Sequence, residues 1–263
     1  MFEEAEAVWR EVACALFATW AARTGRWLRP VPVSQLSATE LEDFWADDQL
    51  VRPTRTEGPS TMHKPLSAVD IVAFGDSRRD TGLQIQLRER MYQLLDKALT
   101  ITGMSLEACH HEDRGDGAFI VAPADAEPSH LMDPLAHHLN ALLRRENRFA
   151  PPHLRLRLRA AAHHGNVEHD QHGIAGRAAI DLFRHLEAPA FKRLMHSNPD
   201  ADLGLVVTDH LFREAAQRGD LVNHDAYRPI RVTVKETRTR AWVWLPPPTQ
   251  QRPTAVTAAP SPL

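Results

Sequence analysis

The 263-residue chain has little of several features that define other classes of protein. Its two cysteines, Cys14 and Cys109, are too few for a disulfide scaffold or a four-cysteine zinc site, and they suit a reducing compartment. A formal net charge of −3 provides no overall attraction to nucleic acid or to an acidic membrane surface. The most apolar early stretch, Val12 to Ala22, is far shorter than the roughly 20 residues of a spanning helix, and no secretory signal is visible. These absences predict a cytoplasmic protein that binds neither nucleic acid nor membrane.

The composition is that of a folded domain with appendages, since 43% of residues are hydrophobic and 25% are charged. Apolar residues at helical spacing predict an amphipathic helix within residues 1–30. Residues 31–67 are proline-containing and polar and predict a partly ordered connector. Residues 247–263 are proline-rich and hold few large apolar side chains, so they predict a disordered tail. The main domain is therefore expected at residues 68–246.

Within residues 68–246, apolar periodicity and turn signals predict alternating strands and helices. Strands are expected at 67–74, at two places within 105–121, and at 154–162, 203–208, 230–234 and 241–245. Helices are expected at 83–102, 134–149, 178–186 and 209–217. The order β-α-β-β-α-β, followed by further elements, predicts an α+β fold. We expect a ferredoxin-like core, extra helices and strands, a mainly antiparallel sheet, and the N-terminal helix beside it.

Two carboxylates occupy places that suggest chemistry. Asp70 interrupts the apolar run of a predicted buried strand, where an unpaired carboxylate is costly, so a cationic partner is expected. Asp116 stands at the tip of a predicted hairpin, where an Asp-Gly pair is common and by itself structural. Together, the two aspartates are able to hold Mg²⁺, which takes one or two protein carboxylates and completes its shell with substrate phosphate oxygens.

Four motifs follow one another at plausible spacing. They are Asp70–Gly75 (DIVAFG), Asp113–Phe119 (DRGDGAF), Arg159–Val167 (RAAAHHGNV) and Gly176–Arg184 (GRAAIDLFR). The ordered set resembles the catalytic domains of class III nucleotidyl cyclases, the adenylate and guanylate cyclases, over residues 68–246. The resemblance implies a lyase that converts a nucleoside triphosphate (NTP) into a 3′,5′-cyclic nucleotide and pyrophosphate. It also implies a head-to-tail homodimer whose active sites lie at the interface.

The resemblance assigns roles to particular residues. Asp70 and Asp116, with the carbonyl group of Ile71, would hold two Mg²⁺ or Mn²⁺ ions. The backbone at Phe74 and Gly75 would cradle the β- and γ-phosphates. Two further phosphate-binding residues would be Arg159, the arginine of the R-x-x-x-H strand, and Lys235, which matches a lysine of the penultimate strand. Arg184 of the other protomer would stabilise the charge that develops in the transition state.

Three positions depart from the pattern of the adenylate cyclases. Ile180 stands where the family usually has an asparagine, so either Asp181 takes over or turnover is weak. Glu112 stands where adenylate cyclases have a lysine, and a carboxylate accepts from a base edge that shows donors, such as guanine, cytosine or uracil. The aspartate that reads the adenine amino group is replaced by Gly173 or His172. ATP is therefore expected to be the least favoured substrate.

Two functions remain open at this point. The first is a cyclase that makes cGMP, cCMP or cUMP, with CTP or UTP favoured because a stand-alone cyclase with a non-adenine base site resembles the bacterial pyrimidine cyclases of antiphage defence. The second is a degenerate cyclase-homology domain that binds nucleotide or a protein partner without turnover. Ordinary structural readings also remain: Arg184 as a helix arginine paired with Glu187, Arg155 and Arg157 as a solvated strand face, and the histidines at 163–172 as a chance cluster.

Overall fold

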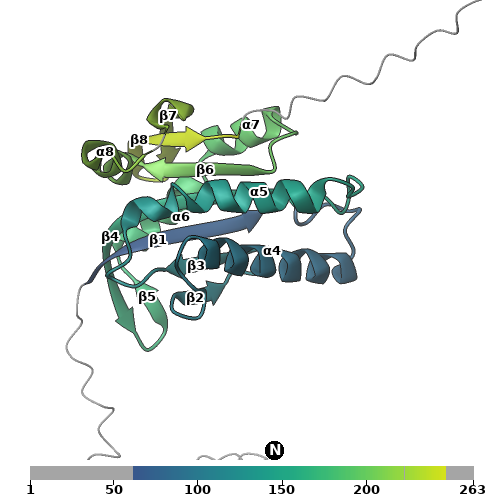
Figure 1. Cartoon of the computed structure of the whole chain (residues 1–263), viewed down its shortest axis with the longest axis horizontal. Coiled ribbons are helices and arrows are strands. Elements are labelled where there is room, and N and C mark those ends of the chain that lie inside the picture. The colour runs from purple at the N-terminus through teal and green to yellow at the C-terminus, as the bar shows by residue number, and fades with distance from the viewer. Residues whose placement is uncertain (1–61, 222, 247–263) are drawn as a thin grey trace, which may run out of the picture. The chain divides into compact units, whose positions relative to one another are not determined.

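The computed structural model describes residues 62–221 and 223–246 (Figure 1). The predicted N-terminal helix and the predicted proline-rich tail lie outside these residues. The strands are β1 (Met62–Ile71), β2 (His110–Asp113), β3 (Gly117–Val121), β4 (Leu158–Asp170), β5 (Gly173–Ala175), β6 (Leu203–Thr208), β7 (Tyr227–Val234) and β8 (Thr237–Trp244). The α-helices are α4 (Thr81–Ile101), α5 (Leu135–Asn147), α6 (Arg177–Leu186), α7 (Pro189–Ser197) and α8 (Asp209–Arg218), and short 3₁₀ turns lie at Pro128–Leu131 and His224–Ala226.

The strands form one sheet in the order β2-β3-β1-β4-β6-β8-β7, with β5 paired to β4 off this path (Figure 1). Neighbouring strands are antiparallel except β4 and β6, which are parallel. The succession β1-α4-β2-β3-α5-β4, with β1 between β3 and β4, is the ferredoxin-like arrangement. The predicted α+β fold with a mainly antiparallel sheet is confirmed.

Helices cover both faces of the sheet because the central strands are buried on both sides. Strand β1 sends Val69 and Ile71 into a core shared with α4, α5 and α8, whereas Leu66 and Ala68 pack with α6 and α7 on the opposite face. Side chains alternate along a strand, so Asp70 points to the α6 face. In the described part of the chain, no helix has the length and apolar character needed to cross a membrane.

Helix α4 illustrates how the sequence determines these elements. Its buried side chains recur at helical spacing and comprise Leu87, Met91, Leu94, Leu95, Ala98 and Leu99. Asp80 precedes the helix, and its carboxylate accepts a 2.8 Å hydrogen bond from the Leu83 amide, which satisfies one donor of the first turn. The helix covers the sheet directly after the turn that ends β1.

Several boundaries differ from the sequence prediction. Strand β1 begins at Met62, inside the segment expected to be connector, and it ends at Ile71 because a turn follows. Strand β4 begins at Leu158 and continues to Asp170, so the predicted strand was placed too early. Helix α7 was not predicted; it begins at Pro189, and proline is well tolerated in the first turn of a helix.

Candidate active site

The end of β1 carries the two aspartates singled out in the sequence. Asp70 is the penultimate residue of the strand and lies opposite Gly117 of β3 and Arg159 of β4. Asp116 belongs to the turn between β2 and β3, and its backbone carbonyl accepts a 2.9 Å hydrogen bond from the Ile71 amide. The hairpin turn is therefore fixed to the end of β1, and the two aspartates occupy the same edge of the sheet.

Gly117 makes this arrangement possible. A Cβ atom at this position would lie 2.1 Å from the backbone carbonyl oxygen of Val69, a distance that no side chain tolerates. Only glycine lets β3 approach β1 so closely at this point. The Asp-Gly pair, predicted as a hairpin signal, thus also sets the separation of the two strands that carry Asp70 and Asp116.

Asp70 is 7% exposed, and Arg159 is the cationic partner that its burial predicts. The Arg159 Nε donates to Asp70 Oδ1 at 2.8 Å, and Nη2 donates to Oδ2 at 2.6 Å. The pKa of Asp70 is raised to about 6, mainly by burial and in small part by the charges of Asp116 and Glu187. The hydrogen bonds and charge of Arg159 oppose this rise. One guanidinium therefore offsets only part of the cost of ionising this carboxylate.

The donor set at this edge fits a hard divalent cation. It consists of two carboxylates and the Ile71 carbonyl group. It is not a cluster of three or more His, Cys, Asp or Glu side chains, and residues 62–221 and 223–246 contain no such cluster able to hold a metal. Mg²⁺ is commonly held by one or two carboxylates plus substrate phosphate oxygens. Each Asp70 oxygen accepts one hydrogen bond from Arg159 and keeps a lone pair for a further ligand. Such a cation would favour the ionised form of Asp70.

The predicted phosphate cradle is the turn that follows β1. Phe74 is half-buried against the α4 face of the sheet, and the Asp76 amide donates to the Ala73 carbonyl at 3.1 Å. Gly75 is exposed, and a Cβ atom there would meet nothing within 4 Å. The turn thus presents backbone to open space next to the aspartates, as a phosphate cradle requires.

Arg184 lies on α6 and is held by the turn between β7 and β8. It donates to Thr237 Oγ1 at 2.7 Å and forms an ion pair with Glu236. The alternative partner considered from the sequence, Glu187, contacts Lys192 and lies 3.7 Å from Arg159. Arg184 is therefore not a helix arginine paired with its own turn.

Lys235 occupies the tip of this same turn. Val234 pairs with Thr237, so Lys235 lies between the two strands, in the left-handed region with φ 50°, and not within a strand as the resemblance implied. It is exposed and directly precedes Glu236, the partner of Arg184. The predicted residues thus fall into two groups: Asp70, Asp116 and Arg159 at the end of β1, and Arg184 with Lys235 at the β7–β8 turn.

Glu112 on β2 binds the β4–β5 hairpin. Its Oε1 accepts from the Ile174 amide at 3.2 Å and lies 3.1 Å from His110 Nε2, while Oε2 accepts from Arg114 at 2.8 Å. Burial alone would raise the pKa of Glu112, but these hydrogen bonds and the Arg114 charge lower it. A Cβ atom on Gly173 would lie 2.6 Å from Oε1. The two positions that the resemblance assigns to base recognition are therefore in contact.

Helix α6 presents the departures from the adenylate-cyclase pattern. Ile180 is 48% exposed and packs into neither core. Asp181, the candidate replacement for the missing asparagine, pairs with Arg177 one turn earlier at 3.1 Å. The helix therefore shows an apolar side chain where the family has an amide, with a carboxylate next to it that is already engaged.

Two arginines that organise this end of the sheet were not assigned roles from the sequence. Arg79 is 9% exposed and donates to the carbonyls of Val72 and Ala73, both at 2.9 Å, which closes the turn after β1. Arg157 precedes β4 and donates to three backbone carbonyls, so it is not on a solvated strand face. Neither pattern is visible in periodicity, because the partners are carbonyls of distant segments.

Comparison with known proteins places this geometry in a fold. The sequence matches no protein-family profile and no curated protein. The structure is similar to an adenylate/guanylate cyclase/hydrolase from Silicibacter pomeroyi, with a TM-score of 0.50 and 16% identity over 70% of this chain and 97% of that one. The guanylyl cyclase Cya2 gives a TM-score of 0.49 and 12% identity over 72% and 93% of the two chains. The domain has the fold of adenylate/guanylate cyclase catalytic domains, and at this identity the likeness extends no further than the fold.

Proposed function

We propose that the chain is a nucleotidyl cyclase, a lyase that converts an NTP into a 3′,5′-cyclic nucleotide and pyrophosphate. The observation that carries the proposal is the pair Asp70 and Asp116. Strands β1 and β3 of a cyclase fold bring both to one edge of the sheet, beside the exposed backbone of Gly75. Two carboxylates that can hold metal ions, next to a turn whose exposed backbone can bind phosphate, suit transfer at a phosphorus atom.

In the proposed reaction, the 3′-oxygen of the ribose attacks the α-phosphorus and the bond to the bridging oxygen of pyrophosphate breaks. Mg²⁺ or Mn²⁺, two ions per site, would lower the pKa of the 3′-hydroxyl and neutralise the triphosphate. Asp70, Asp116 and the Ile71 carbonyl would hold these ions, and Arg159 orients the Asp70 carboxylate through its two hydrogen bonds. The amides of Phe74 and Gly75, with Arg159, would bind the β- and γ-phosphates.

The second group of residues supports a shared site. Lys235 lies in the β7–β8 turn, and Arg184 of α6 is bonded to Glu236 and Thr237 at that turn. Asp70 and Asp116 lie instead at the end of β1 and in the β2–β3 turn. We propose that a head-to-tail homodimer joins this turn of one protomer to the aspartates of the other. Arg184 would then meet the charge that develops on the α-phosphate, and Lys235 would bind the leaving phosphates.

The base is proposed to be other than adenine. Glu112 is an acceptor fixed beside Gly173, and a carboxylate there disfavours N1 of adenine, which is itself an acceptor. Guanine, cytosine and uracil all present donors on that edge. CTP or UTP is the preferred prediction and GTP the alternative; a cytoplasmic location and a role of the product in antiphage defence stay predictions.

A second candidate function is binding without turnover. It is favoured by Ile180, which cannot hydrogen-bond a ribose, and by Asp181, which is engaged by Arg177. In this case the domain would bind an NTP or a protein partner and release no pyrophosphate. Nucleotide binding with no cyclic product at any protein concentration would identify it.

The test is to incubate the purified protein with each of the four NTPs and Mn²⁺ and to identify products by mass spectrometry. The cyclase proposal expects a cyclic nucleotide from at least one NTP other than ATP, at a specific activity that rises with protein concentration. Mixing inactive Asp70→Ala with inactive Arg184→Ala should restore about a quarter of the activity, because each heterodimer has one intact site. No recovery in a mixture shown to exchange subunits would refute the shared site.

A further inference from the structure

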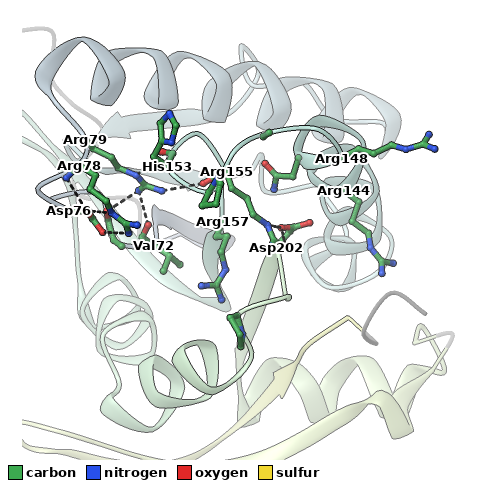
Figure 2. Close-up of a pocket in the computed structure, with 15 residues that line it drawn as sticks. Val72, Asp76, Arg78, Arg79, Arg144, Arg148, His153, Arg155, Arg157 and Asp202 are labelled. Carbon is green, nitrogen blue, oxygen red and sulfur yellow. Dashed lines mark hydrogen bonds and ion pairs between the residues drawn. The ribbon is translucent and has the colours of Figure 1, made fainter. Parts of the chain in front are cut away.

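A pocket of about 780 Å³ lies at the end of β1, beside the turn at Val72 and Ala73. Its lining comes from the turn after β1, the end of α5, the segment before β4 and the segment before β6, and Figure 2 shows Arg79, Arg155 and Arg157 gathered near Val72, with Arg144 and Arg148 at the far side. Six arginines line it: Arg78, Arg79, Arg144, Arg148, Arg155 and Arg157. The proposed catalytic residues Asp70, Asp116 and Arg184 are not among the described residues that line this pocket.

The pocket carries a large positive charge. Its carboxylates are Asp76, which pairs with Arg78 at 2.8 Å, and Asp202, which pairs with Arg155 at 2.7 Å. Six arginines against two aspartates leave the lining with a formal charge of +4, on a chain whose net charge is −3. The lining therefore concentrates a charge of the opposite sign to that of the whole protein.

Arg79 makes its side-chain hydrogen bonds to carbonyls and not to a carboxylate, and the nearby charge of Asp76 offsets only part of its own. In addition to the carbonyls that close the turn, it donates to the carbonyls of Arg155 at 3.1 Å and His153 at 3.4 Å (Figure 2). Carbonyl oxygens satisfy N–H donors, but they carry no net charge, so a buried guanidinium held this way keeps its electrostatic cost. Burial accordingly lowers the pKa of Arg79.

Arg157 repeats this arrangement on the opposite wall. Its guanidinium donates to the carbonyls of Ala201 at 2.9 Å, Met195 at 2.8 Å and Asn198 at 2.9 Å. Burial and the neighbouring Arg155 lower its pKa, and the charges of Asp202 and Asp200 oppose this. The pocket therefore holds two fixed guanidinium groups whose hydrogen bonds go to carbonyls, and an anion would offset the cost of burying both charges.

We infer that this pocket is a binding site for an anion built of linked phosphates, of which inorganic pyrophosphate is the simplest. A guanidinium group can bind two phosphate oxygens at once, and arginines from three segments of chain suit an anion with several phosphate oxygens. None of the described residues that line the pocket is Phe, Tyr or Trp, and the exposed His153 supplies the one aromatic ring among them, so the lining favours phosphate over a stacked base. The pocket shares the turn after β1 with the proposed phosphate cradle, but Asp70, Asp116, Arg159 and Arg184 are not among the described residues that line it.

The experiment is titration calorimetry of the full chain with inorganic pyrophosphate in EDTA, which removes the divalent ions that the catalytic site would need. Ala150 lines the pocket with a methyl group, and its amide donates to the Asn147 carbonyl at 3.1 Å. Ala150→Asp adds a negative charge without removing a contact and should weaken binding about 10-fold or more. Ala150→Asn, of the same size and uncharged, should change it by less than about 3-fold.

Two arginines on the same stretch of chain supply a second comparison. Arg148→Gln removes a lining charge and should weaken pyrophosphate binding about 5- to 10-fold. Arg145→Gln removes an exposed charge that does not line the pocket and should leave the affinity unchanged. Melting temperatures of all variants distinguish loss of binding from loss of folding. Equal effects of Ala150→Asp and Ala150→Asn, or of Arg148→Gln and Arg145→Gln, would overturn the assignment.

The Asp70→Asn variant and other phosphate ligands show whether pyrophosphate binds in this pocket or at the proposed catalytic site. Pyrophosphate should bind Asp70→Asn as well as it binds the wild-type chain, since the pocket does not use Asp70. ATP, CTP, GTP and UTP in EDTA should bind through their phosphates alone, with affinities within about 3-fold of one another. A clear preference for one base, an affinity for orthophosphate equal to that for pyrophosphate, or no pyrophosphate binding at all would contradict the proposal.

Discussion

Two regions at the end of β1 are both built around buried or half-buried arginine, and they compensate its charge in different ways. At the aspartate edge, Arg159 gives two hydrogen bonds to Asp70, so the guanidinium meets a charge of opposite sign. In the adjacent pocket, Arg79 and Arg157 donate to carbonyls, so their N–H groups are satisfied, while nearby carboxylates that they do not bind offset only part of their charges. The first arrangement holds a carboxylate in position, and the second leaves a positive field for an anion.

His163 shows a third solution on the same strand as Arg159. It lies four residues further along β4, and its Nδ1 is 2.8 Å from Thr208 Oγ1. Burial, with a contribution from His185, lowers the pKa of His163 to about 4, so the ring is neutral near pH 7. These side chains thus show three arrangements: Arg159 pairs with a carboxylate, Arg79 and Arg157 donate to carbonyls, and His163 is neutral. Of the three, the arginines that donate to carbonyls keep the most positive charge for a ligand.

The largest expected effect tests the aspartate edge through activity. Asp70→Asn keeps the size of the side chain and removes its charge, so metal binding and cyclase turnover should fall by about 10³-fold or more. Asp225→Asn, at an aspartate whose side chain is 87% exposed, should behave as the wild type. Product formation measured by mass spectrometry over a range of Mn²⁺ decides the outcome, and activity retained by Asp70→Asn would remove Asp70 from the site.

The second prediction compares the two kinds of arginine through stability. Arg159→Met leaves Asp70 buried without a partner and should lower the free energy of unfolding by about 3–5 kcal/mol at pH 8. Arg157→Met leaves only carbonyls without their donor and removes an uncompensated charge, so about 1–2 kcal/mol is expected. Urea unfolding at equal protein concentration measures both.

A double variant sharpens that comparison. Asp70→Asn combined with Arg159→Met removes both charges, so it should be less destabilised than Arg159→Met alone. If instead Arg157→Met costs as much as Arg159→Met, the distinction between paired and carbonyl-bonded arginine is wrong.

The third prediction concerns the pH dependence of stability. Because the pKa of His163 is about 4 in the folded protein and near 6.5 in the unfolded chain, the unfolded state binds the proton more readily between these values. The stabilisation is present above about pH 6.5 and is lost as the pH falls toward 4, by about 2–3 kcal/mol. The difference in free energy of unfolding between the wild type and His163→Gln should therefore shrink by about 2–3 kcal/mol as the pH falls from 6.5 to 4. A difference that stays constant over this range would show that burial does not keep His163 neutral.

The smallest expected effect concerns Glu112. Glu112→Gln removes a partly exposed ion pair with Arg114 and should cost about 0.5–1 kcal/mol of stability, measured by urea unfolding. If Glu112 faces the base, turnover with ATP is roughly 10- to 100-fold lower than with the preferred NTP. In Glu112→Gln this difference in turnover should be smaller. Initial rates for the four NTPs give the readout, and a wild-type preference for ATP would show that Glu112 serves only to bind the β4–β5 hairpin.

Neighbouring residues in the chain were enough to predict the elements whose causes are local. Apolar spacing located α4, the Asp-Gly pair located the β2–β3 hairpin, and the burial of an aspartate in an apolar run required a cation near Asp70. The element order also predicted the α+β sheet that the structure confirms. These inferences depend on the side-chain period of a helix or strand and on the cost of an unpaired charge, which are properties of short segments.

Only the tertiary structure decided which distant groups meet. It chose Arg159 and not Arg155 or Arg157 as the partner of Asp70, because the register of β1 on β4 brings Arg159 alone opposite Asp70. Lys235, expected in a strand, lies in a turn, and Arg184 donates a hydrogen bond to Thr237 of β8. The tertiary structure also brought arginines from three segments around one pocket, and the backbone carbonyls that hold two of them have no signature in the sequence. Long-range pairing of charge is set by strand register and loop path, and neither is encoded in any one stretch of residues.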